Sequence, residues 1–230
     1  NMKIVILAGG FGSRLSEYTK LIPKPMVEVN KKPILIHIMK HYAKYGFKEF
    51  YIALGYKGKI IKDYFKKRKF NNWKINLIDT GLKTMTGGRL KRLKKILEKE
   101  TFMMTYGDGL SNINIKKLLN FHQKNKNIVT LTAVRPPARF GVLKLSGNKI
   151  KYFKEKSKLD TGWINGGFFV MEPSIFKYIK SDKTYLERDP LEKLTKIKKI
   201  SAFRHQGFWQ CMDTKRDKEL LDEILKKKKN

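Results

Sequence analysis

Three short motifs carry residues whose types and spacing suit phosphate chemistry. The first is Ala8–Arg14, in which three glycines precede a serine and an arginine. Glycines let the backbone turn sharply and approach a ligand closely, and the arginine fork matches phosphate oxygens. In the second motif Lys24 stands between Pro23 and Pro25, which hold it on a stiff loop. In the third, two glycines flank Asp108, whose carboxylate is the hard oxygen ligand that Mg2+ prefers.

The glycine loop fits neither of the two common nucleotide-binding patterns. It is no Walker A motif, because no Lys-Ser or Lys-Thr pair follows the glycines. It begins like a dinucleotide-binding motif at Gly10, but Leu15 stands where the last glycine belongs. Taken alone, the loop is equally consistent with a tight turn after a strand. The rigid segment around Lys24 favours the phosphate-binding interpretation.

The order of the surrounding elements indicates an α/β fold that places these motifs at one edge of a sheet. Apolar runs rich in β-branched and aromatic residues predict a buried strand at 3–7 and further strands at 50–54, 75–79, 102–106 and 128–133. Amphipathic patterns predict helices at 33–44 and 115–124, with shorter ones ending near 65 and 97. This alternation implies a Rossmann-like, mostly parallel sheet, in which nucleotides bind beyond the carboxyl ends of the strands.

The pattern changes after residue 135. Segments 140–145 and 150–153, joined by a Ser-Gly-Asn turn, predict a β-hairpin, and 163–170 predicts a further strand. Helices near 174–179 and 190–196, a strand at 200–203 and a last helix ending near 225 complete the chain. A hairpin added to the sheet provides a second wall beside the first motifs, and a ligand is expected between the two.

Composition limits the classes of protein to which the chain can belong. With 230 residues, 41% of them hydrophobic, it is large enough for a substantial core and too apolar to be disordered. No apolar run approaches the ~20 residues that span a bilayer, and the start lacks a signal-peptide pattern, so we expect no membrane partner. Cys211 is the single cysteine, which excludes an internal disulfide and favours a reducing, cytoplasmic location.

The formal net charge of +32 raises the alternative of a nucleic-acid-binding protein. Such a protein predicts clustered arginines and exposed aromatic residues on one face. Only nine of the 52 basic residues are arginine, and the lysines are spread over nearly every predicted helix. A general lysine bias is therefore the favoured explanation, and no nucleic-acid partner is expected. The charge would instead attract anionic substrates.

Three segments resemble the signature of the sugar-phosphate nucleotidyltransferases: Leu7–Gly10, Gly12–Leu15 and Pro23–Met26. The resemblance extends over nearly the whole chain and is strongest to the glucose-1-phosphate cytidylyltransferases. It implies a reaction in which CTP and α-D-glucose 1-phosphate give CDP-glucose and pyrophosphate, with Mg2+ as cofactor. The product would serve nucleotide-sugar and surface-polysaccharide (lipopolysaccharide) biosynthesis. The substrate alternatives are another sugar 1-phosphate, or UTP or dTTP in place of CTP.

The resemblance also implies an organisation and a set of nucleotide-binding residues. It implies a single nucleotidyltransferase domain at 2–230, with a nucleotide-binding part at 2–135. The part at 136–230 would bind the sugar phosphate through the hairpin wall and end in the C-terminal helix. The nucleotide-binding residues that it implies are Leu7, Ala8, Gly9, Gly10, Gly12, Ser13, Arg14, Lys24, Thr86, Gly87, Gly88, Arg89 and Asp108.

Some of these residues have more specific implied roles. Arg14 is expected at the triphosphate, Lys24 at the α-phosphate, and both count as catalytic. Arg89 is the expected contact to CTP, and the amides of Gly87 and Gly88 would face the ligand at a helix start. Without the family, this last segment is a plain helix entry.

The sugar phosphate and the metal ion have their own implied residues. Those for the sugar phosphate are Tyr106, Gly141, Glu155, Lys156, Asn165 and Gly166, with Lys156 on the phosphate. Asp108 and Asp213 are the implied metal ligands. Without the family, Glu155 and Lys156 are surface charges, Gly166 belongs to a bulge, and Asp213 could be a helix N-cap.

Two features depart from the family pattern. Ser157 follows the Glu-Lys pair where many relatives have proline, and only about ten residues separate Phe65 from Ile75 where cytidylyltransferases have a longer insertion. The short loop bears on substrate choice and on subunit contacts. A homo-oligomer is nevertheless the expected assembly.

Overall fold

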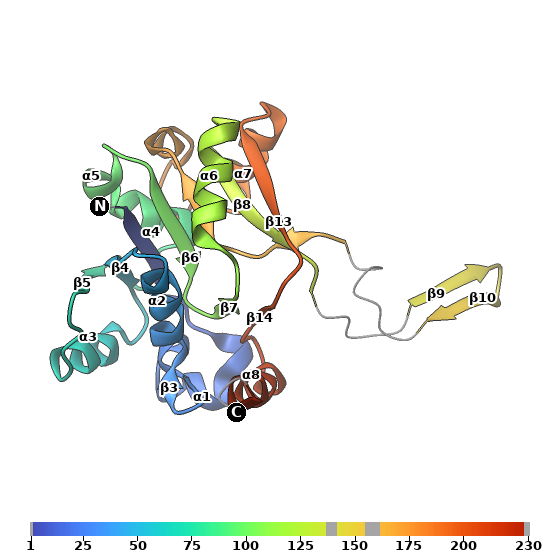
Figure 1. The fold of residues 1–230 in the computed structure, drawn as a ribbon, viewed down its shortest axis with the longest axis horizontal. Helices are drawn as coiled ribbons and strands as arrows, with labels where there is room; N and C mark the ends of the chain where they lie inside the picture. The colour runs from blue at the N-terminus through green and yellow to red at the C-terminus, as the bar shows by residue number, and fades with distance from the viewer. Residues whose placement is uncertain (1, 137–141, 155–161, 228–230) are drawn as a thin grey trace.

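The structure is a computed structural model that describes residues 2–136, 142–154 and 162–227 (Figure 1). Three residues implied for the sugar phosphate, Gly141, Glu155 and Lys156, lie outside the described residues, as does Ser157. Their roles therefore stay predictions.

The central sheet confirms the predicted Rossmann-like architecture. Its strand order is β11-β8-β12-β6-β1-β4-β5, and β13 also pairs with β8. The strands are β1 Lys3–Ala8, β4 Glu49–Leu54, β5 Lys74–Asp79, β6 Phe102–Tyr106, β8 Val129–Val134, β11 Ile164–Asn165, β12 Phe169–Met171 and β13 Ile200–His205. Strands β6, β1, β4 and β5 are parallel, whereas β12 runs antiparallel to β6 and β8. Because four neighbouring strands run in one direction, their carboxyl ends meet at one edge.

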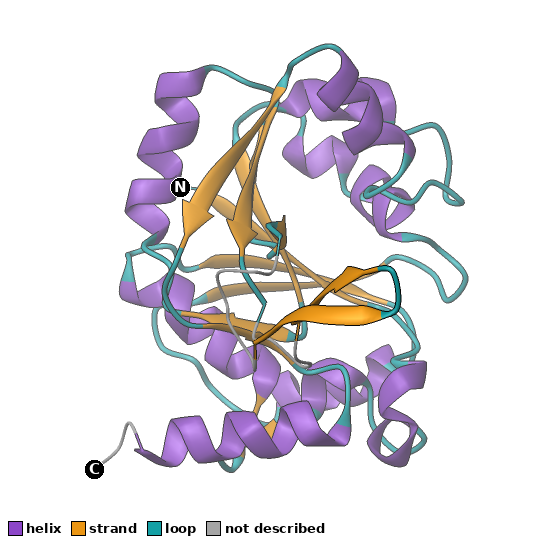
Figure 2. Ribbon diagram, turned by 90° about the vertical axis from the view of Figure 1, so that its right-hand side faces the viewer, coloured by secondary structure: helices purple, strands orange, loops and turns teal. Residues whose placement is uncertain are grey.

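Helices cover both faces of this sheet, as Figure 2 shows. They are α1 Ser16–Thr19, α2 Ile34–Lys44, α3 Gly58–Lys66, α4 Thr86–Arg92, α5 Lys94–Leu97, α6 Ile115–Asn125, α7 Asp189–Lys196 and α8 Lys215–Lys227. The alternating side chains of β1 enter two separate hydrophobic cores. Ile4 and Ile6 pack with residues of α2, α3, α6 and α8, whereas Val5 and Leu7 pack with residues of α4, α5 and α7. Within the described residues no helix is long and apolar enough to cross a membrane.

Three small two-stranded sheets accompany the central one. The predicted hairpin is confirmed as β9 Val142–Ser146 and β10 Lys149–Lys154. The pairs β2 Glu28–Val29 with β3 Lys32–Pro33, and β7 Gly109–Ser111 with β14 Trp209–Cys211, were not predicted. Strands of two or three residues are too short to show an alternating pattern, so they escape detection in the sequence.

The strand predicted at 163–170 is interrupted in the structure. Strand β11 ends at Asn165 and β12 begins at Phe169, and between them Gly167 and Phe168 both have positive φ angles, of 76° and 47°. A Cβ on Gly166 would lie 2.7 Å from the side chain of Val134. The glycine pair therefore makes a break in the strand, in line with the bulge that the residues alone suggested. The helix predicted at 174–179 is a 3-10 helix, Pro173–Tyr178.

Candidate active site

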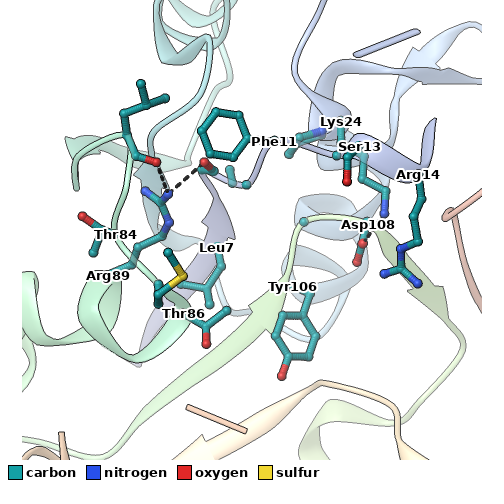
Figure 3. A pocket seen from close by; sticks show the side chains of 18 of the residues that line it. Leu7, Phe11, Ser13, Arg14, Lys24, Thr84, Thr86, Arg89, Tyr106 and Asp108 are labelled. Carbon is teal, nitrogen blue, oxygen red and sulfur yellow. Dashed lines mark hydrogen bonds and ion pairs between the residues drawn. The ribbon is translucent and has the colours of Figure 1, made fainter. Parts of the chain in front are cut away.

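A cavity of about 380 Å3 lies at the carboxyl ends of β1 and β6 (Figure 3). The predicted site residues that line it are Leu7, Ala8, Gly9, Gly10, Gly12, Ser13, Arg14, Lys24, Thr86, Arg89, Tyr106 and Asp108. The residues that line it without having been singled out in the sequence include Phe11, Leu82, Thr84, Met85 and Tyr185. The parallel sheet thus brings motifs from residues 7 to 108 to one place.

Glycine meets a different structural requirement at each of the three positions in the first motif. Gly12 adopts a φ of 64°, a left-handed conformation that favours glycine, and it precedes the 3-10 helix Ser13–Leu15. A Cβ on Gly9 would overlap the guanidinium of Arg89, so this glycine makes room for the chain itself. Around Gly10 a Cβ would meet no atom within 4 Å. Of the three, Gly10 therefore leaves open space beside its backbone, as close approach by a ligand requires.

Lys24 links two carboxylates at one end of the cavity. Its Nζ atom donates to Asp108 Oδ2 at 2.8 Å and to Asp213 Oδ1 at 2.6 Å, and the residue is only 9% exposed. Arg14 pairs with the other oxygen of Asp213 at 3.1 Å. Figure 3 shows Arg14, Lys24 and Asp108 on the same side of the cavity, away from Arg89. This side of the cavity therefore holds two cations and two carboxylates in mutual contact.

The protonation states of Lys24 and Asp213 follow from their contacts. Burial opposes ionisation of Asp213, but the hydrogen bond and charge of Lys24 and the charge of Arg14 hold its pKa below the usual range. Burial likewise acts to lower the pKa of Lys24, but the charges and hydrogen bonds of Asp108 and Asp213 outweigh it and raise that pKa. The ammonium and the Asp213 carboxylate are therefore both charged near neutral pH.

Strand pairing brings the two aspartates together across 105 residues of sequence, since β7 and β14 place Gly109 opposite Cys211. The amide of Met212 donates to the carbonyl of Asp108 at 2.8 Å. The helix that follows is capped by other residues, because Asp217 accepts the amide of Thr214 and donates its own amide to the Thr214 hydroxyl. The Asp213 carboxylate is thereby left to face Lys24 rather than to cap the helix.

The two aspartates fit the requirements of a divalent metal ion. Their oxygens already converge on one cation, the Lys24 ammonium, and carboxylate oxygens suit hard divalent ions. Across residues 2–136, 142–154 and 162–227 no group of three or more His, Cys, Asp or Glu side chains could hold a metal. The remaining ligands would therefore be water and phosphate oxygens, as is usual for such ions at nucleotide sites.

The guanidinium of Arg89 is bound to the chain rather than free in the cavity. Its Nη1 atom donates to Leu54 O at 3.1 Å, Thr80 Oγ1 at 2.8 Å and Gly81 O at 2.7 Å. Its Nη2 atom donates to Gly9 O at 2.9 Å and Leu82 O at 3.4 Å, and two of its bonds are drawn in Figure 3. The residue is 4% exposed, and burial lowers its pKa. Contact of Arg89 with CTP stays a prediction, and the geometry favours a bracing role.

The amides of Gly87 and Gly88 also bind the chain, which differs from the expectation that they face a ligand. Both donate to the carbonyl of Thr184, at 2.9 and 3.2 Å. A Cβ on Gly88 would overlap the backbone of Asp182, and one on Gly87 would lie 2.8 Å from Thr184 O. Neither glycine lines the cavity. These glycines let segment 182–187 pack against the start of α4.

Tyr106 and Asn165 lie together on the side expected for the sugar. The Asn165 amide Nδ2 donates to the Tyr106 hydroxyl at 3.2 Å, and its Oδ1 accepts the amide of Gly167. The Tyr106 hydroxyl donates to Glu187 Oε1 at 2.7 Å. Burial and the nearby Glu187 carboxylate raise the pKa of Tyr106 well above its ordinary value, so the phenol stays neutral. Trp209 donates from its indole to the carbonyl of Gly166 at 2.8 Å.

Comparison with known proteins identifies the family. The family model described as Nucleotidyl transferase matches residues 3–214. The chain belongs to the nucleotidyl transferase family. It is 45% identical over 250 residues to the glucose-1-phosphate cytidylyltransferase of Salmonella typhi, and the alignment covers 99% of this chain and 97% of that protein. It is 42% identical to the probable glucose-1-phosphate cytidylyltransferase of Bacillus subtilis, covering 93% and 92%.

Solved structures agree with the fold of this nucleotidyltransferase. HddC from Yersinia pseudotuberculosis superimposes with a TM-score of 0.77 and 26% identity, over 98% of this chain and 100% of that one. An apo UDP-glucose pyrophosphorylase superimposes equally well, with a TM-score of 0.77 over 100% and 99%, at 17% identity. The predicted family, enzyme class and Rossmann-like fold are thereby confirmed. Nucleotidyltransferases of this family generally use a divalent metal, which agrees with the paired aspartates.

The main residue that the sequence analysis of this nucleotidyltransferase missed is Glu187. It accepts hydrogen bonds from Thr86 and Tyr106, which lie 101 and 81 positions away in the sequence. No motif marks it, because it begins a run of three charged residues, Glu187 to Asp189, that looks like an exposed surface. Its proximity to Leu191 and Leu194, whose helical spacing marks α7, was the one available signal that the segment is ordered.

Proposed function

We propose that this nucleotidyltransferase joins CTP and α-D-glucose 1-phosphate, giving CDP-glucose and pyrophosphate with Mg2+ as the metal. The proposal is supported by the names of relatives that are 45% and 42% identical over nearly the whole chain. The observation that carries it is the cationic pair Arg14 and Lys24 beside two convergent carboxylates at the cavity. Phosphoryl-type transfer depends on this kind of charge placement more than on a protein nucleophile.

The chemistry in this proposal exchanges one bond at the α-phosphorus of CTP for another. A phosphate oxygen of the sugar 1-phosphate attacks the α-phosphorus, and the bond from that phosphorus to the bridging oxygen breaks. The electron pair of the broken bond leaves with pyrophosphate. Because the substrate supplies the nucleophile, the chain has only to align the two phosphates and offset their charge.

The residues of the chain divide this work. Arg14 pairs with Asp213, but its side chain is 73% exposed and can also meet the triphosphate; Lys24 is the buried cation between both carboxylates. Each offsets negative charge that develops as pyrophosphate leaves. Asp108 and Asp213 would hold Mg2+, which when bound neutralises phosphate charge and makes the α-phosphorus more electrophilic.

The two substrates would occupy different ends of the site. We place the nucleoside beside Leu7 and Thr86, because they line the cavity on the side away from Arg14 and Lys24 (Figure 3). The sugar would meet Tyr106 and Asn165, and Lys156 would hold its phosphate. Asn165 and Lys156 belong to the proposed sugar-phosphate-binding part, 136–230, whereas Tyr106 comes from the nucleotide-binding part, 2–135. UTP or dTTP stays an alternative to CTP. The Arg89 guanidinium donates to main-chain carbonyls, among them those of Leu54 and Gly9, and so does not select the base in this arrangement.

The test is pyrophosphate release with glucose 1-phosphate and each of CTP, UTP, dTTP and ATP, with and without Mg2+. We expect Mg2+-dependent release with CTP. Asp108→Asn should lower it at least about 100-fold, because a carboxylate near the metal supplies several kcal/mol of transition-state stabilisation. The matched control is Asp63→Asn, an exposed carboxylate on α3, which should leave the rate unchanged. Absence of release with every nucleotide would contradict the proposal.

A further inference from the structure

The segment before α7 is fixed against the start of α4 by main-chain contacts. Met85 donates its amide to the carbonyl of Asp182 at 2.8 Å, and Gly87 donates to Thr184 O at 2.9 Å. As the two glycines at this contact have no room for a side chain, the segments approach as closely as backbones can. The position of Glu187, three residues further on, is therefore set by this docking.

The Glu187 carboxylate binds one hydroxyl with each of its oxygens. Oε2 accepts from Thr86 Oγ1 at 2.6 Å, and Oε1 accepts from the Tyr106 hydroxyl at 2.7 Å. The Thr86 oxygen in turn accepts the amide of Leu186 at 2.9 Å. Among the described residues no cationic side chain forms an ion pair with Glu187. Two short hydroxyl bonds are thus its charge-stabilising contacts.

Glu187 does not line the cavity itself, but both of its partners do. It is half-buried behind Thr86 and Tyr106. Its hydrogen bonds therefore join a residue at the nucleoside end of the cavity to one at the sugar end. Asn165 extends this row of hydrogen-bonded side chains, because it donates to the Tyr106 oxygen at 3.2 Å.

An ionised carboxylate only accepts hydrogen bonds, and this fixes the direction of every bond in the row. The single proton of the Tyr106 hydroxyl must point to Glu187. The Tyr106 oxygen can then only accept, and Asn165 uses one of its two lone pairs. The remaining lone pair suits a donor such as a sugar hydroxyl, and it repels a phosphate oxygen, which has no proton to give.

We propose that Glu187 is a positioning residue that fixes Tyr106 as a hydrogen-bond acceptor for a hydroxyl of the sugar 1-phosphate. The inference rests on the proposed function, because it presumes that a sugar 1-phosphate is the acceptor substrate. It also sets the orientation of the substrate. Phosphates bind at Arg14 and Lys24, and a sugar hydroxyl donates to the Tyr106 oxygen that Glu187 orients. A sugar bound the other way round would place a phosphate against the Tyr106 oxygen, which can only accept.

The test compares Glu187→Gln, Tyr106→Phe and the double variant, using the nucleotide that the wild-type protein turns over. Tyr106→Phe should raise the KM for glucose 1-phosphate about 10-fold, the value of one hydrogen bond between neutral groups. Glu187→Gln, whose amide oxygen can still accept from Tyr106, should raise it by a smaller factor, and neither variant should change the KM for the nucleotide more than about threefold. The double variant should be no worse than the poorer single variant, because both remove the same interaction. Nucleotide affinity measured by calorimetry without sugar should stay unchanged in Tyr106→Phe, which leaves the bond between Thr86 and Glu187 intact.

A second measurement uses sugar 1-phosphates that lack one hydroxyl each, at the 2, 3, 4 or 6 position. One of these analogues should be a poor substrate for the wild type and should match glucose 1-phosphate in Tyr106→Phe. Glu192→Gln, an exposed carboxylate on α7, is the matched control and should behave as the wild type. If Glu187→Gln melts at a lower temperature, the Tyr106→Phe result decides alone.

Three results would overturn the inference while leaving the proposed function intact. They are an unchanged KM for glucose 1-phosphate in both single variants, additive losses in the double variant, or an equal loss of nucleotide affinity. Absence of wild-type turnover with every nucleotide would overturn the proposed function and this inference together. The two failures are therefore distinguishable by the wild-type assay.

Discussion

The guanidinium of Arg89 connects the glycine loop at Gly9, the end of β4 at Leu54 and the loop at 80–82. A lysine has the same charge but cannot reach acceptors spread over three segments. Arg89→Lys should therefore lower the free energy of unfolding by about 2–3 kcal/mol, because buried carbonyls lose their donors. It should also raise the KM for CTP and UTP equally. Urea unfolding and steady-state kinetics with both nucleotides measure these effects.

The control for this prediction is Arg92→Lys. Arg92 is exposed and pairs with Asp182, and its replacement should change neither stability nor nucleotide KM appreciably. A changed ratio of CTP to UTP activity in Arg89→Lys, with normal stability, would show that Arg89 reads the base after all.

Lys24 and Asp213 should make the stability of the metal-free protein depend on pH at both ends of the scale. The lowered pKa of Asp213 stabilises the fold above the unfolded value of about 3.9, and this contribution is lost as pH falls through the lower folded pKa. The raised pKa of Lys24 stabilises the fold below about 10.4 and is lost as pH rises through the higher folded pKa. The stability advantage of the wild type over Lys24→Met should therefore be constant between about pH 5 and 9 and shrink in acid.

Urea unfolding in EDTA across this pH range is the measurement. Lys62→Met, which removes an exposed lysine of α3, should show no such pH dependence relative to the wild type. An advantage that increased below about pH 4 would be inconsistent with an ionised Asp213 beside Lys24.

For single residues, the sequence predicted several that line the cavity, but it did not reveal which groups their side chains contact in the folded chain. Arg14, Lys24, Tyr106 and Asp108 stand in recognisable motifs, and all four line the cavity. The fork of Arg89 depends instead on carbonyls that only the folded chain brings together. Glu187 could not be found at all from its neighbours, because both of its partners are distant in sequence.

The start of α4 shows that the sequence of an element also does not reveal what packs against it. A helix entry at Thr86 was expected, but a glycine pair there does not reveal whether ligand or chain fills the space. Gly88→Ala should destabilise the protein by about 1–3 kcal/mol despite the better helix propensity of alanine, because the new Cβ overlaps the backbone of Asp182. Thermal unfolding followed by circular dichroism measures the loss.

Gly10→Ala is the matched comparison for Gly88→Ala. A Cβ at Gly10 meets no atom of the chain within 4 Å, so stability should be preserved while nucleotide affinity falls. Stability changes of equal size in the two variants would mean that segment 182–187 yields to the added methyl group.

Elements were predictable where they are long and periodic. The five strands predicted before residue 135 and the helices α2 and α6 are present, because each packs a regular set of apolar side chains against the two cores. The pairing of β7 with β14 was not, although it determines where Asp213 lies. Such short pairings depend on tertiary contacts that leave no periodic signal in the sequence.

For the whole molecule, a net charge of +32 should make the encounter with anionic substrates depend on salt. We expect kcat/KM to fall about threefold or more between about 50 and 300 mM NaCl, mainly through KM, because ions screen the field around the protein. The measurement is the same pyrophosphate assay at several salt concentrations, with glycerol at equal osmolality as control. A salt-independent kcat/KM would mean that the lysines do not steer the substrates.

Strand β12, which comes late in the sequence, lies between β6 and β8, which come early. While the chain is being made on a ribosome, the first 135 residues therefore cannot join β6 to β8, and both strands keep unpaired edges until residues 169–171 have emerged. Nascent chains of this length are where aggregation and chaperone binding should concentrate. For the same reason a fragment ending at residue 135 should not fold, and splitting the protein there would be a poor way to produce either part.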